Sequence, residues 1–190
     1  GAYAHADITD LRGAALFSAG GPAFTPRADG YVIVQRGSTD AASGEALLAA
    51  YAAACELTPG GNALSATNRA VVLIPPGRYT LAAVDGAAAL DLDTDFVDLA
   101  ALGGDPAGTV VTCPGHANGC PTIQQSTSDV RLTGFTVHSS ANGLPGSHAF
   151  DQAAADNSAS RYTRMAFRHD HPASDASPAC GTENIAGAWD

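Results

Sequence analysis

The sequence predicts a mainly β fold, a solenoid of stacked coils with one α-helix ahead of it. Three observations predict this fold class. Helical periodicity is confined to residues 43–56, short strand-like runs separated by turns follow residue 70, and these runs repeat along the chain. We expect residues 1–30 to form an irregular Ala- and Gly-rich arm and residues 31–190 to form a single solenoid domain, with its coils from about residue 70 to 190.

The predicted helix is rich in alanine and carries one apolar face. Ser43 is the expected N-cap, and the Thr-Pro-Gly-Gly run at residues 58–61 cannot continue a helix. The apolar face at helical spacing consists of Leu47, Leu48, Tyr51, Ala54 and Cys55. We expect this face to lie across a sheet or to cover one end of it.

Short β-branched and apolar runs predict strands before and after this helix. The predicted strands are residues 31–35, 71–74, 79–81, 90–92, 96–99, 110–112, 122–124, 130–132 and 135–137. Many of them have only three or four residues, a length that is short for a β-sandwich and normal for the coils of a β-solenoid.

The strand-like runs repeat with an apolar-x-apolar-x-x-apolar pattern. Residues 90–102 align with residues 123–135 at an offset of 33 (130 − 97), which places Leu99 over Leu132. A second offset of 30 (162 − 132) aligns residues 132–137 with residues 162–167. Because one coil cannot bury its apolar face alone, stacked coils with matching side chains make a continuous core. Residues 115–119, 142–147 and 169–178 are the expected protruding loops, where function would lie.

Three segments resemble the start of a right-handed parallel β-helix of the pectate-lyase-like superfamily. They are residues 45–51 (EALLAAY), 72–81 (VLIPPGRYTL) and 130–137 (VRLTGFTV), and the resemblance extends over roughly residues 31–170. It implies that the helix caps the N-terminal end of the solenoid and that residues 75–79 belong to the first coil. It also implies polysaccharide lyase or hydrolase activity, although fold resemblance alone does not establish a function.

A cluster of aspartates is the candidate metal site. Asp91, Asp93 and Asp95 alternate, so on an extended segment their carboxylates would share one face and offer oxygen ligands for Ca²⁺. The resemblance implies such a site, because pectate lyases use carboxylates with Ca²⁺ and an arginine base. No clear arginine partner motif accompanies these aspartates in the sequence, and a solvated outer face is the alternative interpretation.

The candidate catalytic residues lie near the C-terminus. His169 and His171 would share one face of a strand, at a spacing that suits a metal ion or acid–base chemistry, or they would lie in an exposed turn before Pro172. Asp151 and Asp156, near Arg161, would provide the paired carboxylates of a polysaccharide hydrolase, with a role in a turn as the alternative.

Four cysteines bear on the cellular compartment. Cys113 and Cys120 enclose a Gly-, Pro- and Asn-containing loop that suggests a small disulfide, which leaves Cys55 and Cys180 as the second candidate pair; four unpaired thiols are the alternative. The Ala-x-Ala-x-Ala start resembles the end of a signal-peptide cleavage region. These features indicate a secreted or cell-surface bacterial protein.

Composition excludes several classes of protein. The formal net charge is −10 and all nine basic residues are Arg, scattered along the chain, so the basic stripe of a nucleic-acid-binding protein is missing. No apolar run reaches the ~18 residues of a membrane-spanning helix. At 45% hydrophobic and 15% charged residues the chain is neither disordered nor a coiled coil.

The functional expectation is an extracellular β-helix scaffold that self-associates or binds glycan. Its basis is the shortness of the solenoid relative to a polysaccharide-binding groove, and the strand edges that an uncovered solenoid end offers for end-to-end association. The alternative is a polysaccharide lyase or hydrolase. Beyond the Ca²⁺ candidate, no cofactor is expected; the expected partners are further copies of the chain and polysaccharide.

Overall fold

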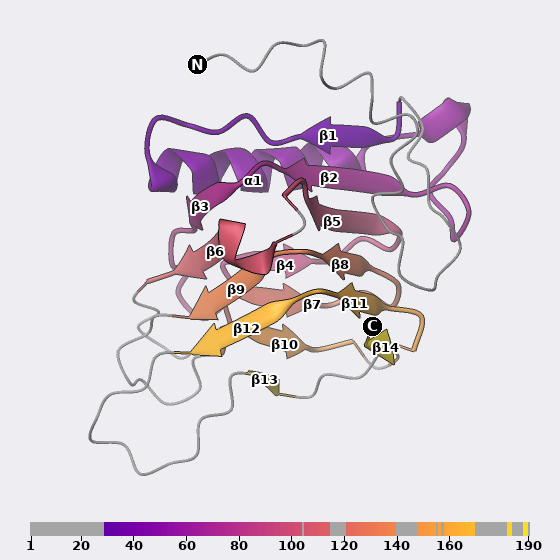
Figure 1. The fold of residues 1–190 in the computed structure, drawn as a ribbon. Helices are drawn as coiled ribbons and strands as arrows, with labels where there is room; N and C mark the ends of the chain where they lie inside the picture. The colour runs from indigo at the N-terminus through magenta and orange to yellow at the C-terminus, as the bar shows by residue number, and fades with distance from the viewer. Residues whose placement is uncertain are drawn as a thin grey trace.

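The computed structural model describes residues 29–103, 105–114, 121–139, 148–154, 156, 158–169, 182–183 and 188–189. These residues form a mainly β solenoid, with three parallel sheets stacked along one axis and one helix at the N-terminal end (Figure 1). The predicted fold class is therefore confirmed.

The strands recur in a fixed order around the solenoid. Sheet I consists of β1 (Tyr31–Ile33), β2 (Ala70–Ile74), β5 (Val97–Ala101), β8 (Arg131–Thr133), β11 (Arg161–Thr163) and β14 (Ala188–Trp189). Sheet II consists of β3 (Gly77–Thr80), β6 (Thr109–Cys113), β9 (Thr136–Ser139) and β12 (Ala166–His169). Sheet III consists of β4 (Leu90–Leu92), β7 (Ile123–Gln125), β10 (Phe150–Gln152) and β13 (Thr182–Glu183). From β2 onward each coil contributes one strand to each sheet in turn, and two short 3₁₀ turns, η2 (Pro59–Gly61) and η3 (Pro106–Gly108), lie in connections.

The register of the strands confirms the sequence repeat. Leu99 pairs with Leu132 at the predicted offset of 33, and Leu132 pairs with Tyr162 at the predicted offset of 30. All strand pairs in the three sheets are parallel and in register, so equivalent side chains of successive coils stack. The interior is filled by such columns, for example Val72, Leu99, Leu132 and Tyr162 on sheet I, all of them buried.

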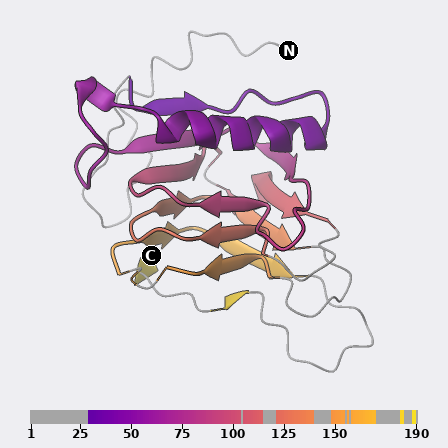
Figure 2. The same ribbon diagram turned by 180° about the vertical axis from the view of Figure 1, so that it is seen from behind.

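The helix α1 (Asp40–Cys55) lies across the N-terminal end of the stack (Figure 2) and packs mainly against β3. It begins earlier than expected, because Thr39 and not Ser43 is the N-cap: Thr39 Oγ1 accepts a hydrogen bond from the Ala42 backbone N–H. Ser43 is buried inside the first turn, where its hydroxyl donates to the Thr39 carbonyl. The predicted face is confirmed in outline, since Leu47 and Tyr51 are buried.

The helix approaches the first coil closely at one glycine. A Cβ atom added at Gly44 would lie 2.1 Å from the Thr80 carbonyl oxygen of β3, a distance that atoms cannot adopt. Gly44 therefore lets the backbone of α1 rest directly on the end of sheet II. This contact fixes how far the helix sits above the first coil.

Four predicted strands begin one residue too early, at residues 96, 122, 130 and 135 instead of at the starts of β5, β7, β8 and β9. Phe96 was expected in a strand, but its φ is 67°, which places it in the turn before β5. Its ring lies against the Arg69 guanidinium, 5.4 Å from ring centroid to Cζ. The turn therefore brings an aromatic ring onto the charged cluster described next.

Candidate functional site

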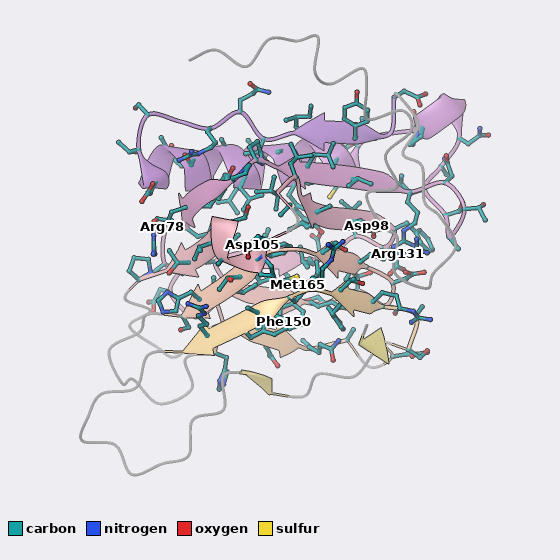
Figure 3. The ribbon with its side chains drawn as sticks, in the orientation of Figure 1. Arg78, Asp98, Asp105, Arg131, Phe150 and Met165 are labelled. Carbon is teal, nitrogen blue, oxygen red and sulfur yellow. The ribbon has the colours of Figure 1, made fainter. Side chains whose placement is uncertain are left out.

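The outer face of sheet I carries a cluster of charged side chains that are joined by hydrogen bonds and ion pairs. One outward-facing column crosses β2, β5, β8 and β11, one residue before the buried column of Val72, Leu99, Leu132 and Tyr162. Its members are Val71, Asp98, Arg131 and Arg161. Figure 3 shows Asp98 and Arg131 close together on this face, with Arg78 on the opposite side of the view. Strand register alone thus produces an acid and two arginines in one column.

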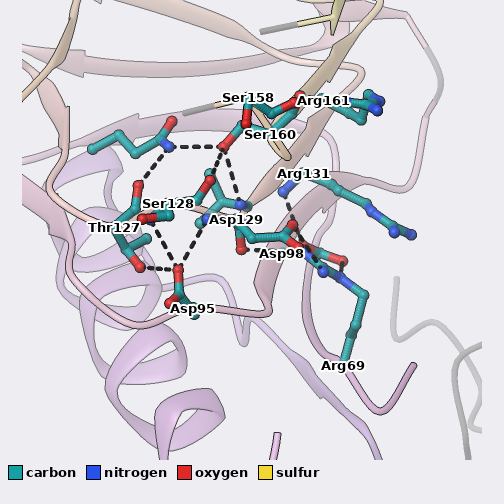
Figure 4. Close-up of polar contacts among 12 residues, drawn as sticks. Arg69, Asp95, Asp98, Thr127, Ser128, Asp129, Arg131, Ser158, Ser160 and Arg161 are labelled. Carbon is teal, nitrogen blue, oxygen red and sulfur yellow. Dashed lines mark hydrogen bonds and ion pairs between the residues drawn. The ribbon is translucent and has the colours of Figure 1, made fainter. Parts of the chain in front are cut away.

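Arg69 connects this column to the preceding turn. Its Nε and Nη2 donate to Asp98 Oδ2 at 2.8 Å and Oδ1 at 2.6 Å, and its Nη1 lies 3.0 Å from Asp129 Oδ1 (Figure 4). Arg69 and Asp98 are almost fully buried, and such a pair persists because both partners are hydrogen-bonded. Burial alone would lower the pKa of Arg69, because it disfavours the charged guanidinium. The hydrogen bonds and the charge of Asp98 outweigh the effect of burial and raise the pKa of Arg69.

Asp98 is the buried carboxylate at the centre of the cluster. Burial raises the pKa of Asp98, and the Arg69 guanidinium acts against that rise. Its Oδ1 also accepts from the Arg131 backbone N–H at 2.8 Å. The carboxylate therefore connects residues from three successive coils of the solenoid.

The two remaining arginines are more accessible. Burial, and then the positive charge of Arg69, lower the pKa of Arg131. Arg161 is exposed, and its Nη1 donates to the carbonyls of Ser158 and Ser160 at the end of the preceding turn. With Asp95 of the neighbouring turn included, the three arginines balance three aspartates, so this region has no net charge (3 − 3) in a chain of −10.

A second carboxylate, Asp95, holds the neighbouring turn. Its Oδ1 accepts from the Thr127 hydroxyl and from the backbone N–H groups of Ser128 and Asp129, the last two at 2.9 Å. Burial pushes the pKa of Asp95 up, but these three donors outweigh it and hold the pKa below its ordinary value. Asp95 thus caps the turn of the next coil, 33 residues further along (128 − 95).

The predicted Ca²⁺ ligands are separated by this arrangement. Asp91 faces outward on β4, but the strand ends at Leu92, so the expected alternation stops there. Asp93 Oδ1 instead accepts from the Tyr51 hydroxyl of α1 at 3.2 Å, and Asp95 caps the turn. Across the described ranges, no group of three or more His, Cys, Asp or Glu side chains is arranged to hold a metal ion.

The predicted catalytic residues fall in different places. Asp151 lies on β10 of sheet III, between Gln124 and Glu183 in register, whereas Arg161 lies on sheet I. Asp156 is exposed and accepts from the Ser158 backbone N–H at 3.0 Å, which lowers its pKa and matches the alternative role in a turn.

One candidate histidine and one cysteine of each predicted disulfide lie outside the residues that the structure describes. His169 is the last residue of β12, in register with Ser139, and His171 lies outside the described residues. Cys55 ends α1 and is partly buried, and Cys113 ends β6 and is buried, with no disulfide between described residues. Their predicted partners, Cys180 and Cys120, are also outside that part of the chain, so both pairings stay predictions.

The sequence pattern did not identify the arginine neighbours of Asp98, which are Arg69 and Arg131. The offset of 33 that aligned Leu99 with Leu132 also places Asp98 beside Arg131, and the offset of 30 places Arg131 beside Arg161, as the register shows. Those two contacts were therefore available from the repeat. Arg69 precedes the aligned units, so no offset pointed to it.

No family model matches the chain, and neither the curated proteins nor the solved structures include a match to it. Within the described residues, none of the helices has the length and apolar character needed to cross a membrane. The class that the fold defines is thus a parallel β-solenoid capped by one helix.

Proposed function

We propose that this chain is a secreted or cell-surface bacterial scaffold, a β-helix that resembles the pectate-lyase-like superfamily in fold and acts without catalysis. The observation that supports the proposal is that the charged side chains of sheet I bond to one another between coils. Asp95, Asp98 and Asp129 each bond to a residue of another turn, and Arg69 joins two of them. Carboxylates held in this way lock the coils together and are not available as acids, bases or metal ligands.

Self-association is the second part of the proposal. β12 lies at the edge of sheet II, and the far side of β12 has no strand partner among the described residues. The Ala166 N–H donates to Phe135 on the β9 side, so in an extended strand the backbone N–H of His169 faces the far edge. An edge of this kind is a template for a further parallel strand, and a second copy of the chain fits it.

A proline substitution tests this edge. We expect His169→Pro, which removes one outward N–H, to lower the assembly mass measured by multi-angle light scattering, while His169→Ala leaves it unchanged. Circular dichroism spectra of both variants should match the parent. A parent chain that stays monomeric at every concentration would overturn the self-association.

Glycan binding is the second candidate function, and the arginine pair on sheet I favours it. Arg131 and Arg161 lie on adjacent strands, about 4.8 Å apart in the parallel ladder, and a guanidinium pairs well with carboxylate groups. The exposed Arg161 guanidinium can pair with a carboxylate of an anionic polymer at this face. A polyuronate is therefore the ligand to test.

Paired substitutions separate binding by this face from general charge effects. We expect Arg131→Gln with Arg161→Gln to abolish retardation in affinity gels containing polyuronate. The matched control, Arg78→Gln with Arg168→Gln, removes the same charge from exposed positions on sheet II and should leave retardation unchanged. Equal losses in both pairs would refute a specific site.

The polysaccharide lyase or hydrolase remains the alternative proposal, carried by the resemblance in fold alone. Its assay is incubation with pectin or alginate, with and without Ca²⁺, followed by absorbance of unsaturated product and reducing ends. If the parent chain cleaves these polymers and a folded Asp98→Asn variant does not, the protein is an enzyme and the scaffold proposal is wrong.

A further inference from the structure

The first strand of the solenoid, β1, has one edge that faces away from every described strand. The Gly30 carbonyl accepts a hydrogen bond from β2 at 2.9 Å, and the Val34 N–H donates one to β2 at 3.0 Å. Backbone groups of alternate residues in a parallel strand face the same neighbour, so those of Val32 also face β2. The backbone N–H and carbonyl groups of Tyr31 and Ile33 therefore face outward at the edge of sheet I.

Three of these four outward groups have no partner in the part of the chain that the structure describes. The Ile33 carbonyl accepts from the exposed Gln35 side-chain amide at 3.3 Å, which leaves the Ile33 N–H and both groups of Tyr31. The strand Tyr-Val-Ile also contains neither a charged residue nor a proline, the devices that commonly protect an edge strand from pairing. The outer edge of β1 is thus open to a further strand.

The helix α1 lies over the N-terminal ends of the other two sheets. On sheet II, Gly44 rests against the Thr80 carbonyl of β3. On sheet III, the Tyr51 hydroxyl accepts from the backbone N–H groups of Asp93 and Thr94, directly after β4, at 2.9 and 3.2 Å. Figure 2 shows α1 across this end of the stack, next to β1. Of the three sheets, sheet I therefore offers the strand through which the N-terminal end can pair with another sheet.

At the opposite end of the stack, β12 is the edge strand that matches β1. The edge strands described there are β12, β13 and β14, and β12 has four residues whereas the other two have two each. β1 has three residues, so β12 is long enough to pair with all of it. Because the strands within each sheet run parallel, a copy added in the same direction along the axis presents its N-terminal edge, and hence β1, to β12.

We propose that copies of this chain join head to tail, with β1 of one copy pairing in parallel with β12 of another. This inference rests on the proposed self-association and specifies the contact that produces it. Since β1 belongs to sheet I and β12 to sheet II, the added copy is rotated about the solenoid axis relative to the first. Repetition of a contact that combines rotation with a shift along the axis gives an open helical filament.

Two proline variants, one at each edge, test the pairing. Ile33→Pro removes an N–H that faces away from β2, and His169→Pro removes the outward N–H of β12, so neither disturbs the ladder within one chain. Each variant alone should stay monomeric in multi-angle light scattering, because one of the two edges is blocked in every copy. An equimolar mixture should form a dimer of twice the monomer mass and nothing larger, since one productive pair of edges remains. The control Ile33→Ala should assemble as the parent does.

The outcomes separate this contact from self-association itself. A parent chain that is monomeric at every concentration overturns both the proposed function and this inference. If the parent and a folded Ile33→Pro variant assemble alike, self-association stands and the role of β1 is wrong. If His169→Pro assembles as the parent does, β1 pairs with another edge and the pairing with β12 is wrong.

Amide hydrogen exchange in the parent chain covers the case in which a proline variant does not fold. We expect exchange of the Tyr31 and Ile33 N–H groups to slow several-fold as the protein concentration rises, because these groups gain partners only in the assembly. The Val32 N–H, which faces β2, should already be protected in the dilute chain. Protection of Tyr31 and Ile33 in the dilute monomer would show that the edge is closed within one chain and would overturn the proposal.

Discussion

Removing the carboxylate of Asp98 is the most informative single perturbation of the charged cluster. Asp98→Ala deletes two hydrogen bonds from Arg69 and one from the Arg131 backbone, and it leaves the Arg69 guanidinium buried. Breaking one partner of a buried pair costs about 3–5 kcal/mol. Because Asp129 still lies 3.0 Å from Arg69 Nη1, we expect a loss near the lower end, about 3 kcal/mol.

Urea denaturation followed by circular dichroism measures this loss. The control Asp91→Ala removes an exposed carboxylate from β4 and should change the free energy of unfolding by less than about 0.5 kcal/mol. The double variant Arg69→Met with Asp98→Leu should recover part of the stability, since it leaves no uncompensated charge. A loss below about 1 kcal/mol for Asp98→Ala would refute the structural role of the cluster.

Three further predictions concern packing and pH. Gly44→Ala should lower the melting temperature, because its Cβ would clash with the Thr80 carbonyl; overpacking costs about 1–3 kcal/mol, and a rise in melting temperature would contradict this contact. The lowered pKa of Asp95 implies stability that is present above its unfolded pKa of about 3.9 and lost as pH falls through its folded pKa, so Asp95→Asn should flatten the acid branch of a pH–stability curve. Burial raises the pKa of Tyr79 to about 12, so the free energy of unfolding should fall above pH ~10; Tyr79→Phe should reduce that slope, and an unchanged slope would argue against burial of the phenol.

The stacking could be predicted from the sequence because it depends on local patterns that repeat. Leu99, Leu132 and Tyr162 are buried side chains at matching positions, and each offset is visible without a structure. The helix start was wrong, since Thr39 and Ser43 both carry hydroxyls ahead of an apolar run. Only the packing of α1 on β3 shows that Ser43 is buried within the first turn.

The candidate site was predicted less well because its contacts join turns, whose geometry the strand pattern does not determine. Alternation predicted one face for Asp91, Asp93 and Asp95, but the strand ends at Leu92 and the last two carboxylates turn to partners on α1 and on the next coil. Tyr51 belongs to no repeat unit, so spacing alone could not identify it as the partner of Asp93. The offset of 33 places Asp95 beside Ser128, but it does not show that the carboxylate accepts hydrogen bonds from that turn.

We propose that the carboxylates of the solenoid bind its coils together and take no part in catalysis. The most direct test is a time course of unsaturated product and reducing ends from pectin and alginate, with Ca²⁺ present and absent. We expect no release above that of a heat-denatured sample. Ca²⁺-dependent release by the parent chain, lost in a variant of Asp98 or Arg131 that keeps its circular dichroism spectrum, would contradict it.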